Sequence, residues 1–116
     1  MSLIWDIEVV KTSTFHPKAL EAIREFPADV RRELGKLIFD LQKGSMLGMP
    51  VSRSMPSVAT GVSELRVRDA NGIYRAFYFV KSERGILIFH AFVKKAQKTP
   101  PAEIELARKR LKEELS

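Results

Sequence analysis

The stretch GVSELRVRDANGIYRAFYFV, residues 61–80, decides the fold, because it contains two strands and the turn that joins them. Apolar and charged side chains alternate in residues 63–68, which is the pattern of a strand with one buried face. Residues 69–72, Asp-Ala-Asn-Gly, are typical of a tight hairpin turn, in which Asn71 and Gly72 are expected to supply positive φ values. The remainder of the stretch is expected to return as an antiparallel strand.

Two helices are expected on the N-terminal side of this stretch. Apolar side chains recur at helical spacing in residues 19–26 and again in residues 30–41. Ser13 and Thr14, followed by Pro17, form a helix-start pattern for the first of these segments. We interpret the two helices as a helical hairpin.

The other elements are expected from shorter signals. Residues 44–62 hold three glycines, two prolines and four serines, and we expect one long irregular connection, with Gly44 as the C-terminal cap of the second helix. Residues 4–10 alternate loosely and predict a first strand, whereas residues 86–93 are nearly all apolar and predict a central strand covered on both faces. Residues 99–101, Thr-Pro-Pro, are expected to begin a last helix.

Together these elements predict an α+β fold. We expect a small antiparallel or mixed twisted sheet of about four strands, packed against an N-terminal helical hairpin and followed by a C-terminal helix. Residues 1–116 are expected to form one domain, because neither half alone would make a convincing core. The N-terminus lacks the basic region of a signal peptide, and no apolar stretch has the length of a membrane helix, so we expect a cytoplasmic protein that does not use a membrane.

The distribution of charge is the first indication of function. The net charge is +6, and residues 64–98 alone carry eight basic and three acidic side chains, a surplus of five. A basic surface favours anionic partners such as nucleic acid, acidic proteins or a membrane surface. A solvated surface with a chance bias is the simpler alternative.

Basic side chains on strands are the only constellation that suggests chemistry. The sequence has no glycine-rich phosphate loop, HExxH or GxSxG motif and no cysteine, and we expect neither a cofactor nor a metal. Arg66 and Arg68 share one face of their strand, and the hairpin brings Arg75 close to facing Arg66. A phosphate placed there would meet several cations at once, because guanidinium groups bind phosphate oxygens through paired hydrogen bonds.

Such a cluster is chemically sufficient to cut RNA without a metal. The 2′-hydroxyl next to the scissile phosphate is the nucleophile, so the protein has only to position it, stabilise the phosphorane and move two protons. Neighbouring cations lower the pKa of a lysine and prepare it to act as a base. The candidate catalytic residues are Glu64, Arg66, Arg75, Lys94 and Lys95, and the candidate RNA-binding residues are Arg68, Tyr74, His90 and Lys98.

A family resemblance supports this interpretation. Residues 61–80, followed by FHAFVKKAQKTPPAEIELARKR at 89–110, resemble the phage-derived HigB branch of the RelE/ParE toxin superfamily. The resemblance implies a ribosome-dependent mRNA endonuclease that stops translation and is neutralised by an antitoxin, usually a small helix-turn-helix protein encoded next to it. It also implies that the basic positions of the family correspond to Arg66, Arg75 and the pair Lys94 and Lys95, with Glu64 at a position that is acidic in this branch.

Two alternatives to the nuclease remain open. One is a toxin of the ParE type, which inhibits DNA gyrase on a similar fold without cutting RNA. The other is a non-catalytic RNA-binding module, because basic strands also make ordinary RNA-binding surfaces. The general base and the general acid are not assigned by the sequence.

Overall fold

The structure, a computed structural model, describes residues 11–82, 85–94 and 99–116. In chain order the elements are β1 Thr12–Phe15, α1 Pro17–Arg24, α2 Ala28–Gln42, β2 Ser52–Ser54, β3 Val62–Asp69, β4 Gly72–Ser82, β5 Gly85–Lys94 and α3 Pro101–Leu115. The expected α+β fold is confirmed, with its helical hairpin, its sheet and its C-terminal helix.

The sheet has five strands in the order β1-β5-β4-β3-β2. β1 pairs with β5 in parallel, and the other neighbours are antiparallel, so the sheet is mixed. The expectation of about four strands included neither β1, since its first strand was placed at residues 4–10, nor β2, which lies inside the segment 44–62 that was expected to be irregular. β2 is only three residues long and pairs with β3 at the sheet edge, and so short a strand leaves no readable alternation among glycines and prolines.

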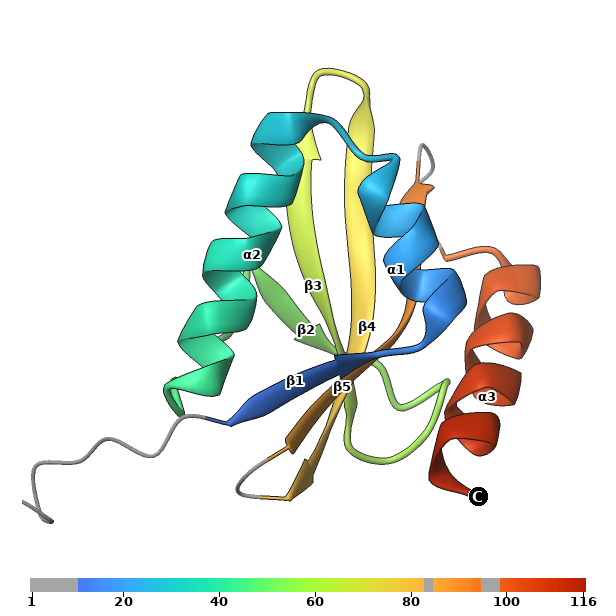
Figure 1. The fold of residues 1–116 in the computed structure, drawn as a ribbon. Helices are drawn as coiled ribbons and strands as arrows, with labels where there is room; N and C mark the ends of the chain where they lie inside the picture. Colours follow the sequence, from blue (N-terminus) through green and yellow to red (C-terminus); the bar gives the residue numbers. More distant parts are fainter. Residues whose placement is uncertain (1–10, 83–84, 95–98) are drawn as a thin grey trace, which may run out of the picture.

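The helices cover the two faces of the sheet (Figure 1). One buried core joins α1 and α2 to the face that carries Leu65 and Val67 of β3. A second core joins Ala107 and Leu111 of α3 to the other face. β5 packs against α1 on one side and α3 on the other, which explains its continuous apolar run. No helix in the described ranges is long and apolar enough to cross a bilayer.

The start of the chain differs from the expectation. The strand expected at residues 4–10 lies outside the described residues, and Ser13 and Thr14 belong to β1 rather than to a helix start. The helix begins at Pro17 as expected, but His16 is its cap, and the His16 Nδ1 accepts a hydrogen bond from the Lys18 N–H at 3.0 Å. Residues 12–15 form a strand because pairing with the edge of β5 gives their backbone groups hydrogen-bond partners.

The second helix ends as expected. Gly44 takes φ +94°, and its N–H donates to the Leu41 carbonyl at 3.0 Å. The Ser45 N–H donates to the Asp40 carbonyl at 3.0 Å, which completes a Schellman motif.

The β3–β4 turn is tight, but it does not use two positive φ values. Only Gly72 has one, at +154°, and Asn71 does not. The Asp69 side chain supplies the missing constraint, because its Oδ1 accepts the N–H groups of Asn71 at 2.8 Å and Gly72 at 3.2 Å. A Cβ on Gly72 would lie 3.0 Å from the Lys94 carbonyl oxygen, so this turn lies tightly against β5.

We expect Gly72→Ala to lower the free energy of unfolding by about 1–3 kcal/mol, because alanine would be strained at this φ and would push against the β5 backbone. Gly35→Ala is the matched control: Gly35 is in α2 with nothing within 4 Å, and alanine there should stabilise the protein by about 0.5–1 kcal/mol. Urea denaturation measures both, and equal effects of the two substitutions would contradict the expectation.

Candidate active site

A pocket of about 560 Å³ lies on the sheet face opposite to the helical hairpin, at the β3–β4 turn. We call it the cationic pocket. Its walls come from β2, β3, β4, β5 and the turn, and its lining residues are Arg53, Arg66, Arg68, Asp69, Ala70, Asn71, Gly72, Ile73, Arg75 and Lys94. Five of the ten are arginine or lysine, so the pocket is suited to bind an anion.

Strand register brings these cations together. Arg66 of β3 pairs directly with Arg75 of β4. Arg53 of β2 pairs with Glu64 of β3. Glu64 lies two residues before Arg66, so both side chains are on the same face of the sheet. Directly opposed like charges on paired strands repel each other, so the fold needs a compensating group.

Glu64 is that group. Its side chain is 0% exposed and lies beneath the arginines, where Oε1 accepts a hydrogen bond from Arg75 Nη1. The same oxygen is 2.9 Å from Arg53 Nη2 and 3.7 Å from Arg66 Nε. One carboxylate therefore holds three guanidinium groups, and the cluster keeps a net positive charge.

Three buried atoms in this cluster have no hydrogen-bond partner within the described ranges: Arg66 Nε, Arg75 Nε and Glu64 Oε2. Arg75 is only 1% exposed, and burying a donor without a partner costs about 1–3 kcal/mol. The carboxylate of Glu64 therefore does not satisfy all the hydrogen-bonding groups of the cluster.

Lys94 is the titratable group of the pocket. It is 3% exposed, and its pKa is lowered to about 8, first by burial and then by the positive charge of Arg75. Glu64 acts in the opposite direction and raises the pKa, whereas Arg53 and Arg66 lower it further. Near neutral pH a sizeable minority of the molecules therefore carries a neutral amine, which an ordinary surface lysine does not.

The structure brings most of the predicted catalytic residues together. Arg66, Arg75 and Lys94 line the cationic pocket with Glu64 beneath them, and the predicted RNA-binding residue Arg68 is exposed in its wall. Lys95 and Lys98 were also predicted, but both lie outside the described residues.

Neither Tyr74 nor His90 lines this pocket. Tyr74 is on the opposite sheet face and packs edge-on against Phe26, with ring centroids 5.0 Å apart. His90 is buried under α3, where Nε2 lies 2.8 Å from Glu103 Oε1 and Nδ1 lies 2.7 Å from Arg110 Nη1. Because arginine only donates, Nδ1 is an acceptor and the ring is neutral, in keeping with a pKa that burial lowers.

Arg53 is a site residue that the sequence analysis missed. It stands in the Ser-Met-Pro-rich segment and has no charged neighbour in sequence to mark it. Only the pairing of β2 with β3 places it against Glu64.

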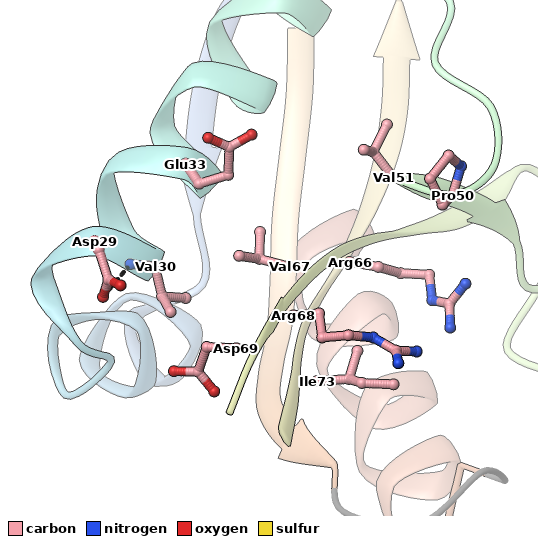
Figure 2. Close-up of a pocket in the computed structure, with 10 residues that line it drawn as sticks. All are labelled: Asp29, Val30, Glu33, Pro50, Val51, Arg66, Val67, Arg68, Asp69 and Ile73. Carbon is pink, nitrogen blue, oxygen red and sulfur yellow. Dashed lines mark hydrogen bonds between the residues drawn. The ribbon is translucent and has the colours of Figure 1, made fainter. Parts of the chain in front are cut away.

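A second pocket, of about 600 Å³, adjoins the first between α2 and β3 (Figure 2). Its lining residues are Asp29, Val30, Glu33, Pro50, Val51, Arg66, Val67, Arg68, Asp69 and Ile73. Arg66, Arg68, Asp69 and Ile73 line both pockets, so the two are neighbours along β3. Within the described part of the chain no group of three or more His, Asp or Glu side chains is placed to hold a metal ion.

Comparison with known proteins agrees with this fold. Residues 21–112 match the phage-derived Gp49-like protein family, and the chain belongs to this family. No curated protein sequence matches the chain.

The fold is that of the RelE toxins. One solved structure with this fold is the toxin–antitoxin complex RelBE2 from Mycobacterium tuberculosis, with a TM-score of 0.53, 18% identity and coverage of 74% of this chain and 100% of that chain. Another is a mutant of the E. coli toxin RelE in the free state, with a TM-score of 0.52, 18% identity and coverage of 90% and 97%.

Proposed function

We propose that this protein is the toxin of a toxin–antitoxin system and cuts mRNA on the ribosome at the cationic pocket. The observation that carries the proposal is the convergence of Arg53, Arg66, Arg75 and Lys94 on one pocket, with a buried carboxylate beneath them. Membership of the Gp49-like family and the RelE toxin fold support the same conclusion. Assignment to the HigB branch stays a prediction from the sequence motifs.

The pocket chemistry fits cleavage by the 2′-hydroxyl. The 2′-oxygen attacks the scissile phosphorus and the 5′-oxygen of the next nucleotide leaves, which yields a 2′,3′-cyclic phosphate and a 5′-hydroxyl. Arg66 and Arg75 line the pocket, and their guanidinium groups stabilise the extra charge on the phosphorane oxygens. No group of the protein has to act as nucleophile.

We assign Lys94 as the general base. Its lowered pKa provides a neutral amine that accepts the proton of the 2′-hydroxyl. The negative charge that develops on the phosphorane stabilises the ammonium that forms beside it. Lys95 stays a predicted participant, and the proton donor to the leaving oxygen is not assigned.

An antitoxin partner follows from the same proposal. The RelBE2 structure is a toxin–antitoxin complex, and a chain with this fold and a cleavage activity needs a neutralising partner in the cell. A helix-turn-helix protein encoded next to this chain is the expected form. Co-expression with the adjacent open reading frame should restore growth.

Mapping of mRNA 5′ ends tests the function. Purified protein is incubated with mRNA in the presence and absence of ribosomes, and new 5′-hydroxyl ends are sequenced. The proposal predicts discrete new ends that need ribosomes. DNA damage on expression without any new RNA ends would favour gyrase inhibition, and salt-sensitive RNA binding without toxicity would favour an RNA-binding module.

The pH dependence of cleavage tests the role of Lys94. A base must be deprotonated, so kcat/KM, which reports the free enzyme, should rise with pH, reach half its maximum at about pH 8 and level off about one unit higher. Lys94→Arg keeps the charge but removes the base, and we expect a rate about 100-fold or more lower, without the rise toward pH 8. An unchanged pH profile in Lys94→Arg would show that another group is the base.

A further inference from the structure

The pocket between α2 and β3 has two walls of opposite charge. Asp29 and Glu33 of α2 line one side, and Arg66 and Arg68 of β3 line the other. Figure 2 shows the α2 carboxylates on one side of Val67 and the two guanidinium groups on the other side. We call this the carboxylate pocket.

The floor between these walls is apolar. Val30 of α2 and Val67 of β3 are buried, and Val51 and Ile73 extend the apolar lining. A volume of about 600 Å³ lies within the range of small-molecule sites, and a flat ring pressed against such a floor would be shielded from water. Enzymes that handle nucleic acids hold single bases between apolar side chains in this way.

Among the ligand classes considered, a nucleotide best matches the two charged walls of the carboxylate pocket. A basic peptide would meet Arg66 and Arg68, and an acidic ligand would meet Asp29 and Glu33. A nucleotide satisfies both walls, because its phosphate is anionic and its base carries N–H donors. Arg66 lines both pockets and pairs with Arg75 of the cationic pocket, so the phosphate would lie beside these two guanidinium groups.

The carboxylates that can accept hydrogen bonds from a bound base are those on α2. Asp69 already uses Oδ1 to accept two N–H groups of the β3–β4 turn. Asp29 accepts one N–H, that of Val30 at 2.9 Å, and both Asp29 and Glu33 are exposed at the pocket. A carboxylate only accepts hydrogen bonds, so the base edge that fits it presents adjacent donors. Guanine does so with N1–H and N2–H, whereas uracil has one N–H between two carbonyl oxygens.

We propose that the carboxylate pocket binds a base next to the scissile phosphate and favours guanine through Asp29 and Glu33. This rests on the proposed cleavage function, because it assigns the base preference of the same site. Asp29 and Glu33 are specificity-determining residues in this account, and they take no part in the chemistry.

Cleavage mapping tests the proposal directly. On ribosome-bound mRNA the wild-type protein should cut with a guanine preference at one fixed position beside the scissile phosphate. In the double variant Asp29→Asn with Glu33→Gln, cleavage should continue, and the preference for guanine over uracil should fall about tenfold or more. Glu21→Gln with Asp40→Asn is the matched control, because it removes the same charge from exposed ion pairs elsewhere on α1 and α2.

A binding measurement separates this proposal from the cleavage function. Wild-type protein should bind guanosine 5′-monophosphate more tightly than uridine 5′-monophosphate, and the Asp29→Asn, Glu33→Gln variant should bind the two alike. This result supports the pocket even if no mRNA is cut, in which case only the proposed function fails. An unchanged base preference in the variant, or weakened binding of the antitoxin in place of nucleotide, would overturn the proposal.

Discussion

Arg75→Ala is expected to reduce mRNA cleavage by about 100- to 1,000-fold, the usual effect of removing one donor that stabilises a transition state. The side chain is 1% exposed and lies at the centre of the cationic pocket. The substitution also breaks a buried ion pair, and we expect an unfolding free energy lower by about 3 kcal/mol. This is the lower end of the usual range, because Arg53 and Arg66 still pair with Glu64.

Two further variants separate chemistry from folding. Arg75→Lys keeps the buried charge, yet it should still cut at least tenfold more slowly, because an ammonium cannot make paired hydrogen bonds to phosphate. Lys81→Ala, an exposed substitution on the same strand, should leave both rate and stability nearly unchanged. The rates are compared per folded molecule, as measured by circular dichroism. Near wild-type cleavage by folded Arg75→Ala would contradict the assignment.

Glu64→Gln is expected to have the second largest effect. The amide keeps the shape of the side chain but leaves three guanidinium groups without their shared counter-charge. We expect a loss of about 2–3 kcal/mol in unfolding free energy, the size of a hydrogen bond to a charged group. We also expect about tenfold slower cleavage, because Arg66 and Arg75 lose the group that positions them.

The pH profile of cleavage by Glu64→Gln tests whether Glu64 is a positioning residue. Glu64 raises the pKa of Lys94, so its neutralisation should lower that pKa, and kcat/KM should reach half its maximum below pH 8. Glu105→Gln, in an exposed pair with Arg108, is the matched control and should change stability by less than about 0.5 kcal/mol. An unchanged pH profile together with a lower rate would contradict the influence of Glu64 on Lys94.

The sequence predicted those parts of the fold that depend on regular patterns. Alternation in β3 and the apolar run of β5 defined the centre of the sheet, and this was enough to place Arg66 and Arg75 together. The sequence patterns did not predict the two edge strands of the sheet, because pairing with neighbouring strands decides their structure. β1 forms where Ser13 and Thr14 suggested a helix start, because it can pair with β5.

The candidate site was predicted from charge, and side-chain contacts show which of the predicted residues line the pocket. His90 and Tyr74 have the chemistry of an RNA site, but one is held by Glu103 and Arg110 and the other packs on Phe26. Neither contact is visible in one sequence, because the partners lie far away along the chain.

Arg53 and the two α2 carboxylates line the pockets but were not predicted, because their positions depend on contacts that the sequence does not show. Arg53 reaches the site only through the short edge strand β2. Asp29 and Glu33 have the pattern of an ordinary solvated helix face. Their proposed role in binding follows only from the pocket that α2 forms with β3.

One substitution in the RNA tests the central claim most directly. A ribosome-bound mRNA is prepared with a single 2′-deoxynucleotide on the 5′ side of the mapped scissile phosphate, and cleavage there is compared with that of the all-ribose mRNA. Metal-free attack by the 2′-hydroxyl predicts that cutting at this phosphate is abolished and that the all-ribose mRNA yields a 2′,3′-cyclic phosphate. Continued cutting at the deoxy position would contradict the account.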